Sequence, residues 1–221
     1  MRQWPGSPRS PHEGKIIDAA EVMAKNLPEM IAGARILGLA HDKTLPANVR
    51  AIFRHADDES RPLTTKEFDE ICQFSSIDSE PLRLLQENAS QVVADVKRRL
   101  VAEDPGLIKP GGSLFPESRS EACWRDCWHF LRIAIYAVAA DRQSFTHPPG
   151  VSGLRELYRE LAVPIDSMAK ALCYLREVSS IHYGSLGGSK DTWRLEMVIR
   201  HLEEMIREFS CQAGEVGAPV L

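Results

Sequence analysis

The sequence predicts an all-α protein, for two reasons. Apolar residues recur at three- and four-residue spacing through most of the chain, and no segment shows the apolar–polar alternation of a half-buried strand. Proline- and glycine-rich stretches divide the helical segments into about eight or nine helices. We therefore expect helices packed on helices around one core.

The composition is that of an ordinary globular protein, with 43% hydrophobic and 26% charged residues among 221. A net charge of −4 indicates no nucleic-acid or anionic membrane partner. No apolar run approaches the roughly 20 residues of a membrane span, and the start of the chain lacks the apolar core of a signal peptide. Five cysteines without disulfide-framework spacing fit a reducing compartment, so we expect a cytoplasmic protein.

The front of the chain is expected to form an extension of the main domain. Residues 1–14 contain three prolines and two glycines, which predicts a flexible tail. Residues 15–40 have helical apolar spacing, and Pro28 should kink that helix or start a second one, because proline lacks the amide donor. This helix is either an extra packing helix or a partner-docking one. We divide the chain into residues 1–44, a tail and extra helix, and residues 45–221, the main domain.

Residues 119–141 predict the central helix. Its second half is apolar nearly all round, which indicates a helix buried in a core. In its first turns, Arg119, Cys123, Asp126 and Cys127 share one side, and Arg125 sits next to Asp126 without facing it. A thiol, a carboxylate and two guanidinium groups suit a ligand with a reactive carbon, polar N–H groups and carboxylate tails.

Local signals predict the remaining elements. Thr64 or Thr65 should cap a helix that follows a hairpin turn, and Asp166 or Ser167 should cap another. The other expected elements are, in order, a helix over 80–101, a loop around 105–112, two helices divided near Pro164, a flexible linker over 182–190 and a helix over 191–209.

The segment Cys-Trp-Arg-Asp at 123–126, with the apolar run after it, resembles the Cys-x-Arg-Asp helix of phycobiliproteins. These globin-like light-harvesting proteins carry open-chain tetrapyrroles, or bilins. The resemblance continues in Leu-Thr-Thr at 63–65, Asn-Ala-Ser at 88–90 and the proline–glycine loop after it, and it is nearest to the β-type subunits. It covers about residues 45–210. It implies a globin-like fold whose N-terminal helical hairpin projects and packs on a partner subunit.

The resemblance also implies a binding site. In the family, the cysteine forms a thioether to the bilin, the aspartate bonds the central pyrrole N–H groups, and arginines hold the propionates. Transferred to this chain, these roles fall on Cys123, Asp126, Arg125 and Arg119. Further candidate pocket residues are Tyr158, Asn88 and Trp128. The implied cofactor is phycocyanobilin or biliverdin, and covalent attachment stays open because a lone helical cysteine is usually a small buried apolar residue.

Three departures from the antenna pattern favour a divergent member, such as a bilin biosynthesis-associated globin. Trp124 and Trp128 are bulky neighbours of Cys123, the late loop has no second bilin cysteine, and the front extension is not an antenna feature. We therefore predict a non-enzymatic bilin carrier or chaperone, with bilin-synthesising enzymes as partners. The alternatives are a phycobilisome subunit of photosynthetic light harvesting with bilin on Cys123, a pigment-free structural or regulatory protein, and a bilin-modifying enzyme using Asp126 as a proton donor.

A metal site is not predicted. Cys123 and Cys127 have a ligand-like spacing, but His129 points about 160° away from Cys127 around the helix. The sequence also lacks a Walker loop, a nucleophile elbow and an HExxH helix, so it offers no support for nucleotide or ordinary hydrolase chemistry.

The resemblance implies a homodimer in which Asp57 of each chain meets Arg132 of the other, with Tyr136 completing the contact. The alternative is that Arg132 pairs within its own chain, with Glu160 or Asp69. A monomer would also expose an apolar stripe on the hairpin, formed by Val49, Ile52 and Phe53.

Overall fold

The all-α prediction is confirmed. The computed structural model describes residues 19–211, and in this part of the chain it has nine α-helices and no strand. The helices are α1 (Ala19–Gly33), α2 (Ala47–Asp58), α3 (Thr65–Ser75), α4 (Ser79–Glu87), α5 (Ala89–Glu103), α6 (Glu117–Ala139), α7 (Pro148–Glu160), α8 (Ile165–Tyr183) and α9 (Thr192–Cys211). The tail expected over 1–14 and the start of the helix expected over 15–40 lie outside the described residues.

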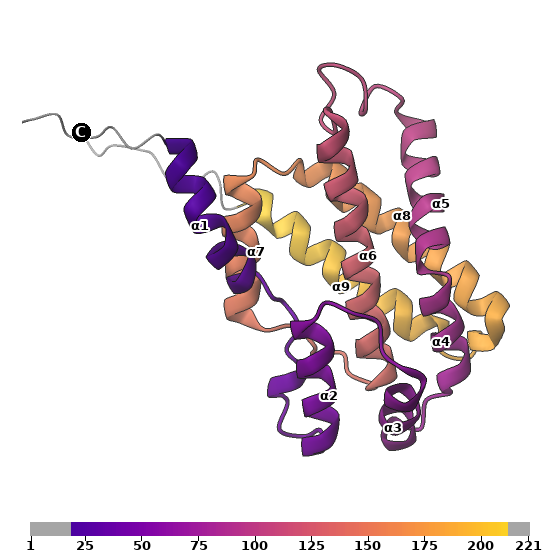
Figure 1. The fold of residues 1–221 in the computed structure, drawn as a ribbon. Coiled ribbons are helices and arrows are strands. Elements are labelled where there is room, and N and C mark those ends of the chain that lie inside the picture. Colours follow the sequence, from indigo (N-terminus) through magenta and orange to yellow (C-terminus); the bar gives the residue numbers. More distant parts are fainter. Residues whose placement is uncertain (1–18, 212–221) are drawn as a thin grey trace, which may run out of the picture.

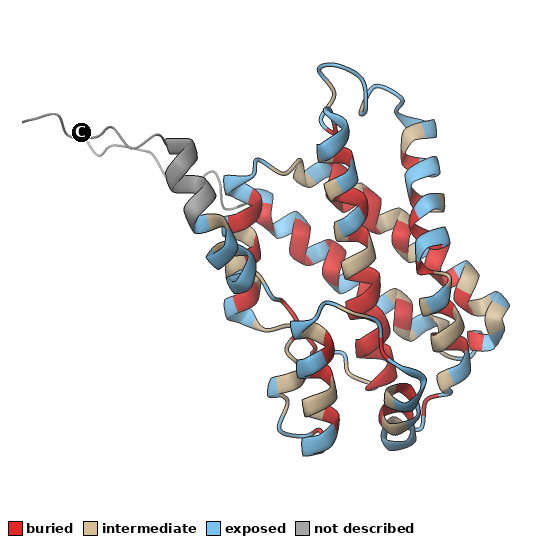
Figure 2. Ribbon diagram, in the orientation of Figure 1, coloured by how far each residue is buried: buried red, intermediate tan, exposed pale blue. Residues whose placement is uncertain are grey.

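Helix α6 runs through the middle of the molecule, as its apolar second half predicts. Every residue from Phe130 to Ala139 is buried (Figure 2). Helices α5, α8 and α9 pack against α6 and complete the core on one side, while α7 and α1 lie on the other side (Figure 1). None of the described helices has the length and apolar character that crossing a membrane would require.

The helix expected over 80–101 is two helices, because Asn88 interrupts it. The Asn88 side-chain amide donates to the Leu84 carbonyl at 2.8 Å, and its backbone N–H donates to the same oxygen at 3.1 Å. Asparagine competes for backbone acceptors in this way, and α4 therefore ends where α5 begins. Apolar spacing alone does not reveal such a break.

Of the two predicted helix caps, one is right and one is wrong. Thr64 forms a capping box with Glu67 at the start of α3, as expected. Helix α8 instead begins after Pro164 without a side-chain cap, and Ser167 bonds to the Ser113 hydroxyl at 2.9 Å. The expected linker over 182–190 contains a π-helical turn, η2 (Gly184–Gly188), in which Gly187 adopts a φ of 99° that favours glycine.

The N-terminal segment, residues 19–44, packs against the main domain. A single helix, α1, runs through Pro28, so no second helix starts there. Beyond α1, the backbone pairs with the turn before α7, through Gly38 N–H to Phe145 O at 2.6 Å and His147 N–H to Ile36 O at 2.7 Å. Two glycines of α7 permit this approach: a Cβ on Gly150 would lie 1.7 Å from Arg35 O, and one on Gly153 would lie 2.3 Å from Gly33 O.

The predicted dimer contact through the hairpin is wrong, because the same chain makes it. Arg132 Nη2 donates to Asp57 Oδ1 at 2.9 Å, and the Tyr136 hydroxyl donates to Arg61 O. Arg132 thus pairs within its chain, although with neither of the two carboxylates considered above.

The predicted apolar stripe is also wrong. Val49 and Phe53 are buried, because α2 packs against the short 3₁₀ helix η1 (Leu39–His41), and the Phe53 ring also contacts the Tyr136 ring of α6. The N-terminal segment therefore covers the hairpin surface that was expected to need a partner.

Candidate functional site

A cavity of about 670 Å³ lies between the first half of α6 and helix α7. The loop before α6 and the start of α8 close one end of it, through Leu114, Pro116 and Met168. The N-terminal segment supplies a further wall through Ile31, Ala34 and Ile36. Its volume is in the range of sites for cofactors and other small molecules, and most of its wall is apolar.

Four polar residues of α6 form a row along this cavity. Cys123, Asp126, His129 and Arg132 recur every third residue, and all four line the cavity. Residues at this spacing are neighbours on one helix face, with an axial rise of about 4.5 Å per step. The α6 wall from Ser118 to Ile133 is therefore roughly 22 Å long, which suits an elongated ligand.

Asp126 lies at the middle of the row and is held by Tyr158 of α7. The Tyr158 hydroxyl donates to Asp126 Oδ2 at 2.8 Å. Burial raises the pKa of Asp126, whereas the Tyr158 hydrogen bond and the nearby Arg125 charge oppose that rise. Burial and the neighbouring carboxylate raise the pKa of Tyr158 well above its usual value, so Tyr158 stays a donor. Asp126 thus offers its remaining acceptor capacity to N–H donors in the cavity.

The two arginines of the site lie near Asp126 and Cys123. The Arg125 Nε atom is 4.0 Å from Asp126 Oδ1, and 67% of the Arg125 side chain is exposed. Arg119 donates from Nη1 to the Ala162 carbonyl at 2.8 Å, which holds it against the segment between α7 and α8. Both line the cavity. Guanidinium groups in this arrangement can bind carboxylates.

The two neighbouring cysteines of α6 differ in access. Cys123 lines the cavity, whereas Cys127, expected on the same face, is fully buried and does not line it. A hydrogen bond with Cys123 and burial raise the pKa of the Cys127 thiol well above its usual value. Of the two, Cys123 is the thiol that a ligand in the cavity can meet. The described residues hold no group of three or more His, Cys, Asp or Glu that could bind a metal.

Two of the predicted site residues do not line this cavity. Asn88 lies at the junction of α4 and α5, and Trp128 stands edge-on to His129, outside the lining. Trp124 faces away as well, with its ring under Lys97 of α5. The structure does bring together the other five predicted residues: Cys123, Asp126, Arg125, Arg119 and Tyr158.

Two parts of the site were not predicted from the sequence. His129 was considered only as a possible metal ligand. Its three-residue spacing from Asp126 nevertheless places it next to Asp126 on one face of the helix. The wall built by Ile31 and Ile36 had no local signal, because it depends on how the N-terminal segment folds back on α7.

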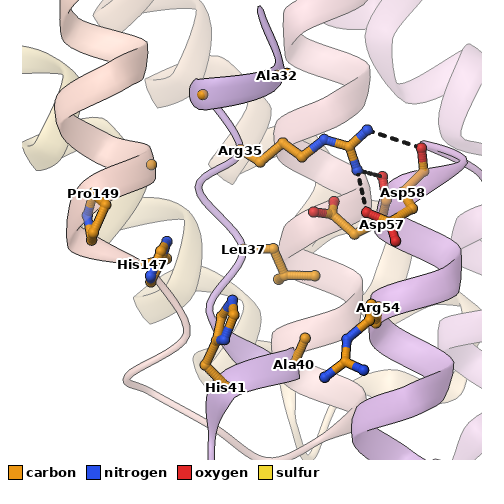
Figure 3. Close-up of a pocket in the computed structure, with 12 residues that line it drawn as sticks. Ala32, Arg35, Leu37, Ala40, His41, Arg54, Asp57, Asp58, His147 and Pro149 are labelled. Atoms are coloured by element: carbon orange, nitrogen blue, oxygen red, sulfur yellow. Dashed lines mark hydrogen bonds and ion pairs between the residues drawn. The ribbon is translucent and has the colours of Figure 1, made fainter. Parts of the chain in front are cut away.

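A second pocket, of about 450 Å³, lies between the N-terminal segment, α2 and the start of α7 (Figure 3). Arg35 crosses its upper edge, with Nη1 2.7 Å from Asp58 Oδ1 and 3.0 Å from the Asp57 carbonyl. The rings of His41 and His147 stack 4.7 Å apart beside it. These contacts tie the N-terminal segment to α2 and to the turn before α7, and so hold the wall of the larger cavity in place.

The chain is similar in sequence to one group of known proteins. The family model described as "Phycobilisome protein" matches residues 51–209. The allophycocyanin alpha chain of Mastigocladus laminosus is 30% identical over 129 residues, 57% of this chain and 81% of its own length. Those of Cyanophora paradoxa and Anabaena cylindrica are each 29% identical, over 61% and 57% of this chain and 83% and 81% of their own lengths. These relatives are alpha chains and lend no support to the expected β-type likeness.

Proposed function

The chain belongs to the phycobilisome protein family, and on this premise we propose that it binds an open-chain tetrapyrrole, without catalysis, between α6 and α7. The observation that carries the proposal is a half-buried carboxylate, Asp126, held by Tyr158 in the middle of a long, largely apolar cavity. A bilin has the complementary chemistry: apolar rings along its length, central N–H groups and two propionates.

Each group of the site has a role in this proposal. Asp126 accepts hydrogen bonds from the central N–H groups, and charge-assisted bonds of this kind are about twice as strong as neutral ones. Tyr158 holds the Asp126 carboxylate in position. Arg119 and Arg125 hold the propionates, and Arg125 reaches solvent, where those carboxylates would also lie. Phycocyanobilin and biliverdin both have these features.

We propose a carrier or chaperone role beside bilin-synthesising enzymes. The supporting observation is that Ile31, Ala34 and Ile36 of the same chain form one wall of the cavity, so that wall does not require a second subunit. The second candidate is a light-harvesting subunit with bilin in thioether linkage to Cys123. That candidate is favoured by the position of Cys123 in the cavity, three residues from Asp126.

The decisive experiment is co-expression with a bilin-producing pathway, followed by absorbance spectra before and after denaturation in acidic urea. We expect a coloured protein whose pigment is released on denaturation, as for a carrier. Pigment that stays with the denatured chain would assign the light-harvesting chemistry instead. A colourless protein would reject bilin binding altogether.

The variant Asp126→Asn tests the proposed site itself. Loss of the charged acceptor should weaken binding by about 1.5–3 kcal/mol and reduce or blue-shift the long-wavelength band, because the bound chromophore loses its counter-charge. An unchanged spectrum and affinity would remove Asp126 from the site. Asp95→Asn, on α5 and away from the cavity, is the matched control.

A further inference from the structure

His129 is a cavity residue to which the proposed function gives no role. It lies on the α6 face three residues beyond Asp126, about 4.5 Å further along the helix axis. Arg119 and Cys123 lie on the opposite side of Asp126 along the same helix. A ligand whose centre is bound by Asp126 and whose carboxylates are bound by the arginines would therefore extend one of its ends past His129.

The polar neighbours of His129 already have partners. Arg132 is paired with Asp57 at 2.9 Å, and Asp126 with Tyr158 at 2.8 Å. Among the described residues, the His129 ring has a contact with the Trp128 ring, at 5.0 Å between centroids, and no hydrogen bond is found. Its ring nitrogens are therefore available to a ligand at this end of the cavity.

His129 is neutral when it meets that ligand. Burial, reinforced by the charges of Arg132 and Arg125 and opposed by Asp57, lowers the pKa of His129 to about 4. A neutral imidazole has one N–H donor and one acceptor nitrogen. This pattern matches a neutral amide-like group better than a carboxylate, for which the arginines of the site are the better partners.

We infer that His129 is a ligand-positioning residue that hydrogen-bonds the terminal lactam of the open-chain tetrapyrrole. The lactam ring at each end of such a molecule has a carbonyl oxygen, which accepts a hydrogen bond from the N–H donor of a neutral imidazole. His129 thus selects for an intact lactam at the end of the ligand remote from Arg119. This inference deepens the proposed bilin-binding function and rests on it.

The test compares wild type with His129→Phe, which keeps a ring of similar size, and His129→Gln, which restores a donor and an acceptor. Each protein is titrated with three probes: biliverdin, biliverdin dimethyl ester and a dideoxybiladiene, which lacks both terminal carbonyl oxygens. Binding is followed by quenching of tryptophan fluorescence and by the long-wavelength absorption band. His55→Phe, on the exposed surface of α2, is the matched control for a histidine-to-phenylalanine change.

We expect His129→Phe to weaken the binding of biliverdin and of its dimethyl ester by the same factor, about tenfold, and to shift the band. The loss should be absent with the dideoxybiladiene and mostly restored in His129→Gln. A loss confined to free biliverdin would assign His129 to a propionate and overturn the inference, as would equal losses with all three probes.

The same titrations separate this inference from the proposed function. If Asp126→Asn weakens binding while His129→Phe leaves it unchanged, the lactam contact alone is wrong. If the wild-type protein binds none of the probes, both the proposed bilin binding and the lactam contact of His129 are wrong. Should His129→Phe fail to fold, judged by its helical circular dichroism, unchanged binding of all three probes by His129→Ala would still refute the contact.

Discussion

Asp57 and Arg132, 75 residues apart in the sequence, form an ion pair inside one chain, with 2.9 Å between Asp57 Oδ1 and Arg132 Nη2. Arg132 is 94% buried, and its Nε atom has no hydrogen-bond partner among the described residues. The pair fastens α2 to the middle of α6, next to the row of cavity residues. It satisfies a buried charge within the chain, so that charge does not require a second subunit.

Removing Asp57 should destabilise the fold strongly. Asp57→Asn leaves the Arg132 charge buried without its carboxylate, and we expect the free energy of unfolding to fall by about 3 kcal/mol or more. Asp58→Asn is the control: Asp58 is 62% exposed in its ion pair with Arg35, so that change should cost no more than about 1 kcal/mol. Urea denaturation of both variants checks this. Equal losses of unfolding free energy in the two variants would show that the buried ion pair stabilises the fold no more than the exposed one.

Asp126 should cost the ligand-free protein stability at neutral pH. Burial raises its pKa in the folded state, so the folded state is penalised once pH rises through that pKa, and no penalty exists below the unfolded value. We expect Asp126→Asn to be more stable than wild type at pH 7, and this gain to shrink as pH falls toward 4. Unfolding in urea at several pH values measures the difference.

Glu67 provides a control of opposite sign for the Asp126 experiment. The hydrogen bond from Arg61 lowers the pKa of Glu67 to about 2, so its contribution to stability is present above pH 4.5 and is lost as pH falls toward 2. Glu67→Gln should therefore destabilise the protein at pH 7. A loss of stability in Asp126→Asn at pH 7 would contradict the assigned cost of its burial.

The contact between α7 and the N-terminal segment should depend on Gly150. A Cβ at this position would lie 1.7 Å from the Arg35 carbonyl oxygen, so Gly150→Ala must push the segment off α7. We expect a loss of about 1–3 kcal/mol in the free energy of unfolding and faster proteolysis of residues 34–46. Gly184→Ala is the control, because the nearest atom to its Cβ is 3.8 Å away. Identical behaviour of the two variants would refute the tight packing.

Cys123→Ala distinguishes carriage from covalent attachment. For a carrier, the variant should retain bilin binding within about threefold, because removal of one small buried group costs little beside the Asp126 and arginine contacts. Cys127→Ala is the control, since Cys127 does not line the cavity. Mass spectrometry that finds the bilin mass on the Cys123 peptide of the wild-type protein would overturn the expected reversible binding.

Several features of this protein could be derived from the sequence by itself. Helical spacing predicted α6 and its buried second half, and the pair Thr64 and Thr65 marked the start of α3, where Thr64 is the cap. Arg119, Cys123 and Asp126 of the site lie within two turns of one helix, and their common face follows from the α-helical repeat. These predictions succeeded because each depends on residues only a few positions apart.

Only the tertiary structure decided what those residues meet. Tyr158 is 32 residues from Asp126, and the backbone of the N-terminal segment reaches α7 over more than 100 residues. The spacing of residues along the chain does not give the distance in space between partners so far apart in sequence. Arg132 shows the physical reason most directly: a buried charge requires a carboxylate, but burial alone does not specify which chain supplies it. The packing of α2 on η1, and of the Phe53 ring on the Tyr136 ring of α6, places Asp57 of the same chain beside Arg132.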